Sequence, residues 1–263
     1  MPELPEVETV VQTLKVKILN QELIKIVSRK PETVVLMEPF KPFTITAIER
    51  RGKYIIICGP HAEKLIIHLR MTGRITESPT NPQFVRATLY TDKHILQFED
   101  MRRFGRIIFT KNNHIDDLPG IKNLGAEPWH SSLDTTFPKQ LKASSKNVKS
   151  FLLDQSKIAG IGNIYADESC YHARILPTRK GHHLSTKEAK RLLYSIRYIL
   201  TKAIYLRGTT FAHFIDADGK KGGNLEYLAV YGRKKKPCFH CRQELTTKKL
   251  QGRTTVYCSY CQQ

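Results

Sequence analysis

The sequence predicts an α+β fold, in which an N-terminal helix with a β-sandwich is followed by a helical domain that ends in a four-cysteine ribbon. Three features of the 263-residue chain predict this order. Apolar residues recur at spacings of three and four over residues 4–18, short β-rich runs fill about residues 23–110, and helical spacing returns beyond residue 146. We expect these boundaries: 1–115 for the β-sandwich domain, 116–145 for a linker, 146–230 for the helical domain and 231–263 for the ribbon.

The first element is predicted as an amphipathic helix, because Leu4, Val7, Val11, Leu14 and Ile18 share one helical face. The β-rich runs that follow are separated by Gly, Pro, Asn and Asp, which are typical of strand ends. The runs most clearly expected as strands are residues 45–48, 54–58, 65–69, 87–90, 94–98 and 106–109. A β-sandwich with an N-terminal helix is the economical interpretation.

The second half is predicted to be helical after an irregular linker that contains Pro119, Pro128 and Pro138. Helices are expected near residues 148–155 and 163–173. The best-marked helix begins at Ser185, because Glu188 three residues later completes a capping box. Gly208 is expected to end that helix, and a glycine-rich loop follows at residues 209–224.

The charge of the chain indicates a polyanionic partner. There are 43 Lys and Arg against 24 Asp and Glu, a formal net charge of +19. Nucleic acid is the favoured partner, ahead of a merely soluble basic surface or an acidic membrane. No stretch reaches the ~18 apolar residues of a membrane span, and the first ten residues hold acidic but no basic side chains, unlike a signal peptide. We expect a cytoplasmic protein that does not enter membranes.

Four of the six cysteines have the spacing of a metal-binding ribbon, C-x2-C-x16-C-x2-C. Two tight knuckles bring four thiolates into a closed tetrahedron, so we expect one structural Zn²⁺. About 25 residues cannot bury a core, and the metal would therefore supply folding free energy. A pair of disulfides is the alternative, disfavoured for a chain among reduced thiols. The expected ligands are Cys238, Cys241, Cys258 and Cys261, whereas Cys58 and Cys170 are expected to be buried apolar fillers.

The ribbon itself is strongly basic. Residues 231–263 contain eight Lys and Arg and one acidic residue, Glu244, which gives +8 − 1 = +7. Such a charge on a hairpin is typical of a phosphate-binding element. A solvated basic face is the plainer alternative.

The amino terminus carries a chemically unusual residue, Pro2. Initiator methionine is normally removed before a small residue, which would expose a secondary amine. An α-amino group has a pKa of about 7.7–8.0, so much of it is neutral near physiological pH and able to attack an aldehyde-like carbon. Glu3 and Glu6 lie nearby as possible proton donors or acceptors. Taken alone, Pro2 is more simply explained as a helix-start residue.

Several ordered motifs together resemble the formamidopyrimidine-DNA glycosylase family. They are the start Pro2-Glu-Leu-Pro-Glu-Val-Glu-Thr9, then Arg51-Gly-Lys53-Tyr54, His68-Leu-Arg-Met71-Thr-Gly73, Arg102-Arg103-Phe104-Gly105, Gly162-Asn163-Ile-Tyr165-Ala-Asp-Glu168 and Gly252-Arg253-Thr254. The resemblance covers essentially the whole chain. It implies a β-sandwich domain, a helix-two-turn-helix domain and a zinc ribbon.

The resemblance also implies the catalytic residues. Pro2 would attack the anomeric carbon of a damaged nucleotide, displace the base and hold the opened sugar as a Schiff base. Glu3 would manage protons at the sugar, with Glu6 assisting at the same helix start. Lys53 would reach toward a phosphate and the damaged nucleotide.

The remaining implied residues bind DNA. Lys149, Asn163 and Arg253 match backbone-phosphate contacts. The gap left by the extruded nucleotide would be filled by Met71, Arg102 and Phe104, and the loop at 209–224 would cover the flipped base. His68 and Arg103 belong to the same DNA-binding motifs. Two departures from the family pattern stand out: Met101 replaces a usual proline, and Asp216 and Asp218 lie in the loop.

The implied activity is a DNA glycosylase with abasic-site lyase activity, acting as a monomer on double-stranded DNA that contains oxidised purines or abasic sites. An endonuclease VIII-type glycosylase for oxidised pyrimidines is the nearest alternative, disfavoured because Leu4 stands where that branch usually has glycine. A zinc-ribbon DNA-binding protein without catalysis is the third, disfavoured because Pro2, Glu3, Glu6 and Lys53 are all present.

Overall fold

The computed structural model describes residues 1–112, 115–117 and 120–263, so that Pro119 of the expected linker lies outside the described residues. The chain divides into two compact units, each built from two stretches of sequence. The first unit comprises Met1–Lys122 and Leu206–Leu225, and the second comprises Asn123–Tyr205 and Glu226–Gln263. The loop at 209–224, which we expected within the helical domain, therefore packs with the first unit.

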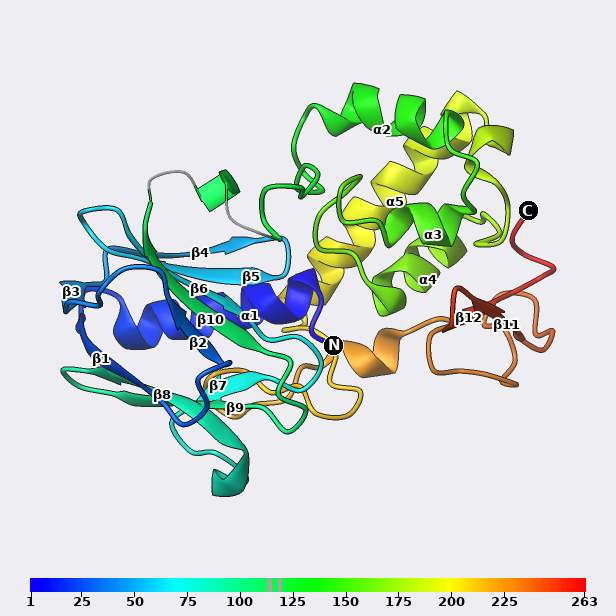
Figure 1. The fold of residues 1–263 in the computed structure, drawn as a ribbon. Coiled ribbons are helices and arrows are strands. Elements are labelled where there is room, and N and C mark those ends of the chain that lie inside the picture. Colours follow the sequence, from blue (N-terminus) through cyan, green and yellow to red (C-terminus); the bar gives the residue numbers. More distant parts are fainter. Residues whose placement is uncertain (113–114, 118–119) are drawn as a thin grey trace. The chain divides into compact units, whose positions relative to one another are not determined.

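The first unit is a β-sandwich with a helix in its core. One sheet has the order β3-β1-β8-β9-β7 and the other β2-β10-β6-β5-β4, and every pairing except β2 with β10 is antiparallel. Their bounds are β1 Glu22–Ser28, β2 Val34–Leu36, β3 Phe43–Thr44, β4 Ala47–Arg51, β5 Tyr54–Cys58, β6 Glu63–His68, β7 Arg74–Thr76, β8 Val85–Thr91, β9 Ile95–Glu99 and β10 Arg106–Lys111. Short 3₁₀ turns lie at Pro82–Phe84 and Ile115–Asp117. Figure 1 shows the two layers with α1 running along them.

Helix α1 spans Leu4–Ile18, as the apolar spacing predicts. Its Val7, Val10, Val11, Leu14 and Ile18 belong to one buried cluster with inward-facing residues of both sheets. The helix packs mainly on β4 and β5, and central strands such as β5 are buried almost throughout. This burial fixes where the helix begins, and therefore where the amino terminus lies.

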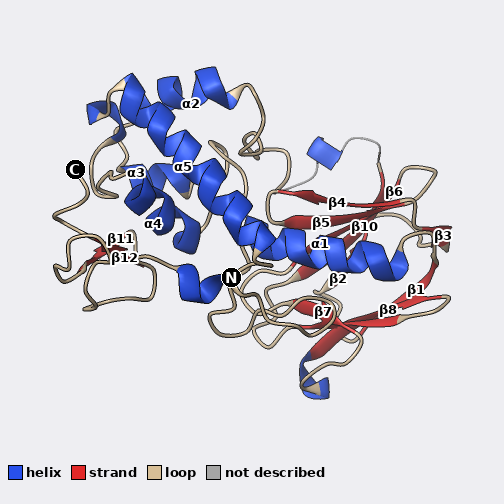
Figure 2. Ribbon diagram, turned by 180° about the vertical axis from the view of Figure 1, so that it is seen from behind, coloured by secondary structure: helices blue, strands red, loops and turns tan. Residues whose placement is uncertain are grey.

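The second unit is helical and carries a hairpin. It contains α2 Leu133–Lys142, α3 Val148–Leu152, α4 Asn163–His172 and α5 Thr186–Tyr205, followed by β11 Thr246–Leu250 and β12 Arg253–Tyr257. Helices α2 and α4 both pack on α5, and β12 packs on α4 (Figure 2). A 3₁₀ turn lies at Gly181–His183, and another, Asn224–Tyr227, begins in the first unit and ends in the second. The α+β class and the ribbon are as predicted.

Local hydrogen bonds explain the bounds of α5. The Glu188 N–H donates to the Ser185 hydroxyl over 3.2 Å, and the Ser185 N–H donates to the Glu188 carboxylate over 2.7 Å. This confirms the predicted capping box. The helix ends at Tyr205, and Gly208 then adopts a φ of +78°, a left-handed conformation that suits glycine.

The expected linker differs from the prediction, because α2 lies inside residues 116–145. Pro138 stands within this helix. Leu133, Phe137 and Leu141 recur every four residues and are buried, so tertiary packing compensates for the proline. Among the described helices, none has the length and apolar character that crossing a bilayer requires.

Candidate active site, phosphate contacts and metal centre

The start of α1 holds the first candidate residues. Glu3 is the N-cap of the helix and Pro5 stands in its first turn, so Pro2 precedes the helix altogether. The helix-start explanation of proline therefore applies to Pro5 and not to Pro2. Pro2 is buried, and the Glu3 side chain next to it is only 2% exposed. A secondary amine at this position would have a buried carboxyl group as its immediate neighbour.

The Glu6 carboxylate connects this helix start to the loop at 209–224. One oxygen accepts the Glu3 N–H over 2.8 Å, and the other accepts the Thr209 N–H over 2.7 Å. A Cβ placed on Gly208 would come within 3.0 Å of the same carboxylate. A residue with a side chain at position 208 could not approach the Glu6 carboxylate so closely. Gly208 and Glu6 together therefore hold the loop against the amino-terminal helix.

Lys53 and His68 lie at one end of the sheet that contains β5 and β6. Gly52, in the turn between β4 and β5, has a φ of +56°, and Lys53 immediately precedes Tyr54, which pairs with His68 across the two strands. Both side chains are buried, at 6% and 8% exposure. The turn therefore carries a lysine inward beside a histidine.

The protonation state of His68 follows from its surroundings. Its Nδ1 accepts the Arg70 N–H over 2.9 Å, so the neutral ring carries its proton on Nε2. Burial, followed by the positive charges of Arg70 and Lys53, lowers the pKa of His68 from 6.5 to about 3. His68 is therefore a neutral hydrogen-bond donor through Nε2 at physiological pH.

The residues expected to fill a gap in DNA are on the surface. Met71, Arg102, Arg103 and Phe104 are all exposed, with Met71 at 41% and Phe104 at 49%. The Arg102 guanidinium lies 4.9 Å from the centre of the Phe104 ring, a cation–π arrangement. Apolar side chains so exposed are not part of a core, so Met71 and Phe104 do not serve as core residues.

Asp100 connects the loop that carries Met71 to the loop that carries Phe104, and the sequence did not identify it. Its buried carboxylate accepts the Thr72 hydroxyl over 2.5 Å, the Arg102 N–H over 3.2 Å and the Gly105 N–H over 2.7 Å. It thereby joins the loop that carries Met71 to the loop that carries Phe104. These bonds fix the second loop although Met101 stands where a rigid proline was expected. The only available signal was an acidic residue directly before an exposed basic loop.

The loop at 209–224 is anchored inside the first unit. Ala217 belongs to its core cluster, and the Asp216 carboxylate, 1% exposed, pairs with Arg207 over 2.5 Å. The Asp216 carboxylate also accepts the Asp218 and Lys220 N–H groups, each over 2.9 Å. Its acidic charge thus holds the turn in place. A Cβ on Gly222 would lie 2.2 Å from the Gly208 carbonyl oxygen, so this glycine serves the closure of the loop on itself.

The expected phosphate contacts of the second unit converge on the ribbon hairpin. Lys149 Nζ and Asn163 Nδ2 both donate to the Thr254 carbonyl, over 2.9 and 3.3 Å. Arg253 is exposed and follows a two-residue turn, Gln251 and Gly252, with φ of 48° and 75°. Positive φ at both positions is the type I′ turn that tightens hairpins. The hairpin turn therefore fixes where Arg253 emerges.

Lys149 differs from the exposed cation that a phosphate contact suggests. Its side chain is 0% exposed and pairs with Asp167 over 2.8 Å. The second oxygen of Asp167 accepts the Val256 N–H over 3.2 Å, so the pair ties α3 and α4 to β12. The neighbouring Glu168 carboxylate accepts the N–H groups of Ala229, Val230 and Tyr231 over 2.8–2.9 Å. Two consecutive acids of α4 thus set the orientation of the ribbon.

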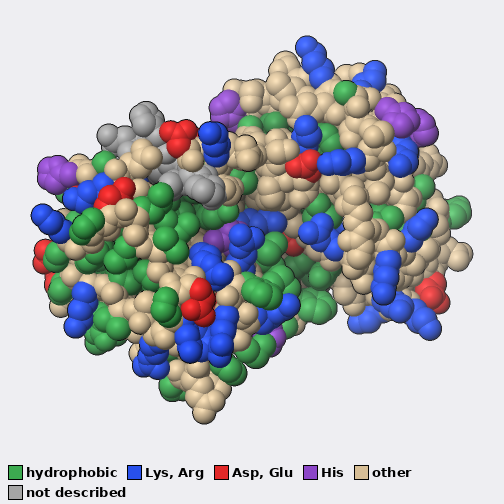
Figure 3. Space-filling model, viewed as in Figure 1, with side chains coloured by type: hydrophobic (Ala, Val, Ile, Leu, Met, Phe, Trp, Pro, Cys, Tyr) green, Lys and Arg blue, Asp and Glu red, His purple; other side chains and the backbone are tan. Residues whose placement is uncertain are grey.

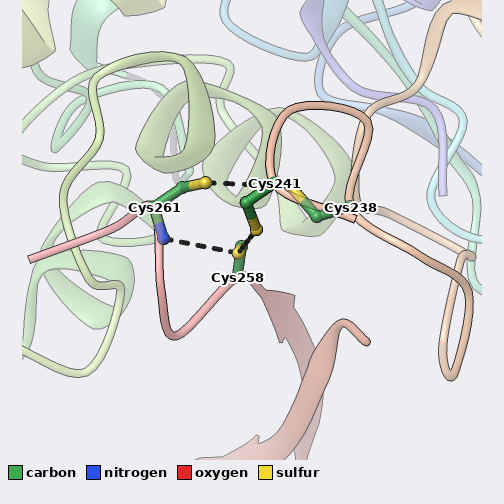
Figure 4. Close-up of side chains that lie close together, drawn as sticks. All are labelled: Cys238, Cys241, Cys258 and Cys261. Carbon is green, nitrogen blue, oxygen red and sulfur yellow. Dashed lines mark hydrogen bonds between the residues drawn. The ribbon is translucent and has the colours of Figure 1, made fainter. Parts of the chain in front are cut away.

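The four ribbon cysteines converge on one point (Figure 4). Their sulfur atoms all lie within 4.8 Å of one another, and among the described residues all six cysteines are free of disulfides. The sulfurs of Cys238 and Cys261 are 3.9 Å apart and those of Cys241 and Cys258 are 3.4 Å apart. A regular tetrahedron with metal–sulfur bonds of ~2.3 Å would separate its sulfurs by ~3.8 Å. The cluster could therefore hold a metal ion.

The ribbon has only a small buried cluster of its own. Its buried cluster contains Val230, Leu245 and Val256 besides two of the cysteines. Figure 3 shows Lys and Arg side chains gathered over the hairpin.

Cys58 and Cys170 are buried, as expected, and burial raises the pKa of each thiol. The first unit thus holds Pro2, Glu3, Glu6, Lys53, His68 and the exposed loops, and the second holds Lys149, Asn163, Arg253 and the cysteines.

Two family models match the chain. Residues 1–107 match the formamidopyrimidine-DNA glycosylase N-terminal domain, and residues 124–214 match the formamidopyrimidine-DNA glycosylase H2TH domain. A protein named formamidopyrimidine-DNA glycosylase from Pelotomaculum thermopropionicum is 41% identical over 274 residues, which cover 100% of this chain and 99% of that one.

Solved structures agree with these matches. The MutM (Fpg) protein of Thermus thermophilus is 36% identical with a TM-score of 0.93, over 99% of this chain and 98% of that chain. A Lactococcus lactis Fpg variant in complex with DNA containing Fapy-dG is 33% identical with a TM-score of 0.91, over 100% of both chains. Other similar chains are in complex with DNA containing carbocyclic 8-oxo-G, an abasic site or an oxidised pyrimidine.

Proposed function

Because the chain belongs to the formamidopyrimidine-DNA glycosylase family, we propose that it excises oxidised purines from double-stranded DNA and then cleaves the strand as an abasic-site lyase. The substrates are 8-oxoguanine, formamidopyrimidines and pre-formed abasic sites. The protein acts as a monomer on DNA in the cytoplasm.

The observation that carries the proposal is the position of Pro2. It lies outside the helix, directly before the buried Glu3, and the helix-start explanation applies to another proline. After removal of Met1, the Pro2 nitrogen attacks the sugar C1′ and the bond to the base breaks. The base leaves with a proton. The sugar ring then opens as the C1′–O4′ bond breaks, the proton of the Pro2 nitrogen passes to O4′, and the opened sugar stays joined to Pro2 as an iminium. Elimination of the 3′ and 5′ phosphates from this adduct cleaves the strand.

Other residues serve this reaction without forming the covalent bond. Glu3 transfers protons at the sugar, because its carboxyl group is adjacent to the nucleophile. Lys53 and the neutral His68 bind the phosphate of the damaged nucleotide, and Glu6 holds the loop at 209–224 against the helix start. Met71, Arg102 and Phe104, with Arg103 beside them, fill the gap left by the extruded nucleotide. Arg253 and Asn163 bind backbone phosphates, and Lys149 supports them from its buried pair with Asp167.

We propose Zn²⁺ as the ion held by Cys238, Cys241, Cys258 and Cys261. Four thiolates at near-tetrahedral separations are the donor set of structural zinc. Because the site has four protein ligands and no open position, the metal stabilises the ribbon and takes no part in the reaction. Metal analysis should return one zinc per chain, and Cys258→Ser should lose both the zinc and duplex binding. A zinc-free protein that binds duplex normally would contradict this.

Borohydride trapping tests the reaction. Protein and a duplex with one 8-oxoguanine are mixed with sodium borohydride, which reduces the iminium to a stable bond. We expect a denaturation-resistant adduct whose crosslink maps to the first peptide. The matched control keeps extra residues before Pro2, so that its nitrogen is an amide with no available lone pair. That protein should bind the duplex and form no adduct.

Two results would sink the assignment: an adduct that maps to Lys53, or full activity in the protein with a blocked amino terminus. A panel of duplexes then separates the alternatives. Preference for oxidised pyrimidines would favour the endonuclease VIII-type specificity, and one solved Lactococcus lactis Fpg does have an oxidised pyrimidine in its DNA. Binding without cleavage of any lesion would favour the non-catalytic alternative.

A further inference from the structure

Helix α5 presents an exposed row of tyrosines and cations that the proposed reaction does not use. Tyr194, Tyr198 and Tyr205 are 64%, 47% and 85% exposed. They recur with Lys187, Arg191 and Lys202 at intervals of three and four residues. At 100° per residue, these six positions fall within an arc of about 80°. Leu192, Ile196 and Leu200 lie on the opposite side of the helix and are buried. Helix α5 lies toward the viewer in Figure 2.

A hollow continues this row at the side of the helix. Its volume is about 600 Å³, and its lining includes His172, Arg174, Arg191, His240 and Tyr260. Arg191 belongs to both features. The His172 ring also stacks on the Tyr198 ring, with centroids 4.7 Å apart and planes at 23°. We call the α5 row together with these lining residues the α5 surface.

The α5 surface is positively charged. It carries Lys187, Arg191, Lys202 and Arg174, and its acid Glu188 is already paired with Arg179 over 2.5 Å. Lys202 Nζ lies 4.7 Å from the centre of the Tyr227 ring, which adds another aromatic face next to a cation. A polyanion complements such a surface electrostatically.

This surface is separate from the expected duplex contacts of the same unit. Asn163, which bonds the Thr254 carbonyl beside Arg253, is the first residue of α4, whereas His172 is the last. Nine steps of ~1.5 Å place these two ends about 14 Å apart. A ligand on the α5 surface would therefore contact groups other than those that bind duplex phosphates.

We propose that the α5 surface binds single-stranded nucleic acid. Exposed aromatic rings that lie among cations along one line suit a strand whose bases stack while its phosphates pair with Lys and Arg. Tyr194, Tyr198 and Tyr260 provide the stacking faces, and Lys187, Arg191 and Arg174 the cations. An acidic peptide could satisfy the cations, but it offers no planar bases for the tyrosine rings. The proposal does not depend on the glycosylase reaction.

The experiment uses the full-length protein with its duplex site already saturated by an unlabelled duplex that carries a stable abasic-site analogue. A fluorescent ten-nucleotide oligothymidine is then titrated, and binding is followed by anisotropy. We expect the wild type to bind it. Because each stacked base contributes ~1–3 kcal/mol, Tyr194→Ala with Tyr198→Ala should weaken this binding at least about tenfold. Cleavage of lesion duplex should be unchanged.

Two further variants sharpen the result. Lys187→Gln with Arg191→Gln should reduce the salt dependence of oligothymidine binding by about 1.4 in slope, at ~0.7 per lost phosphate contact. Tyr90→Ala is the matched control, because Tyr90 lies 4.5 Å from Lys25 Nζ as a cation–aromatic pair in the first unit. It should leave oligothymidine binding unchanged.

Three outcomes would overturn the proposal. They are no oligothymidine binding once the duplex site is saturated, equal binding by the wild type and the double tyrosine variant, and displacement of the oligonucleotide by oligoglutamate at lower concentration. The last would assign the surface to an acidic protein partner. Thermal unfolding of the double variant should match the wild type, since both side chains are exposed.

Discussion

Individual carboxylates do much of the positioning in this molecule. Glu6 and Asp100 in the first unit, and Glu168 in the second, each accept two or three hydrogen bonds from backbone or hydroxyl groups while buried. Charged acceptors form stronger bonds than neutral ones, and burial protects those bonds from water. Loops are held in this way at the helix start, at the exposed residues Met71 and Phe104, and at the ribbon.

Glu6→Gln should therefore destabilise the protein although it preserves shape. A glutamine has one acceptor oxygen, so its amide group would face the N–H of either Glu3 or Thr209. We expect the free energy of unfolding in urea to fall by about 2 kcal/mol. Glu32→Gln, at an exposed turn position, should change it by less than ~0.5 kcal/mol. Equal effects of the two variants would mean that Glu6 does not anchor the loop.

His68 should make the protein sensitive to acid. Its folded-state pKa of about 3 lies below the unfolded value of 6.5, so the unfolded chain binds more protons as the pH falls below 6.5. Stability contributed by the neutral ring is present above pH 6.5 and is lost toward pH 3. At ~1.36 kcal/mol per pH unit, the loss at pH 5 is about 2 kcal/mol.

Urea unfolding of the wild type and His68→Gln at pH 7.5 and pH 5 checks this. The wild type should lose about 2 kcal/mol more than the variant over that interval, because all other titrating groups are shared. The same loss in both proteins would show that the ring is protonated in the folded state.

At the scale of elements, local chemistry was predictable and packing was not. The capping box of α5, the spacing of α1 and the cysteine pairs depend on residues close in sequence, and all three occur as expected. Helix α2 was missed, because Pro138 suggests a linker and only burial of Leu133, Phe137 and Leu141 stabilises the helix. Short strands β2 and β7, of three residues each, depend on their partners rather than on a local pattern.

The same limit applies to the candidate site. Motif residues such as Lys53 and Phe104 could be named from sequence, but Asp100 could not, because its role lies in bonds to Thr72 and Gly105. The burial of Lys149 could not be predicted from sequence either, because its partners Asp167 and Thr254 are distant in the chain.

The two exposed loops should act in extruding the nucleotide. Met71→Ala and Phe104→Ala should each slow cleavage at a paired 8-oxoguanine about tenfold or more, because unpairing costs a few kcal/mol. Cleavage at a pre-formed abasic site should change much less. Leu36→Ala, which removes another half-exposed apolar side chain of the first unit, should affect neither substrate. Equal losses on both substrates would assign the two side chains to another step.

For the whole molecule, the +19 charge predicts binding that weakens steeply with salt, and two cations should differ in how they contribute. Arg253→Gln should lower the salt slope of duplex binding by about 1, whereas Lys41→Gln, at an exposed position of the first unit, should lower it much less.

Lys149→Ala should instead reduce the free energy of unfolding by about 3–5 kcal/mol, because it leaves Asp167 buried without its partner. A Lys149→Ala protein of normal stability would contradict this.

The division of the chain has a consequence for its synthesis. The first unit is complete only when Leu206–Leu225 joins Met1–Lys122, since Ala217 belongs to its core. Domains generally fold in order as they leave the ribosome. Here the first unit must wait, with one part of its core absent, while α2 to α5 of the second unit are being made. The second unit waits in turn for the ribbon after residue 225. Because the chain passes between the units after Lys122, Tyr205 and Leu225, no single proteolytic cut releases either unit as a free-standing piece.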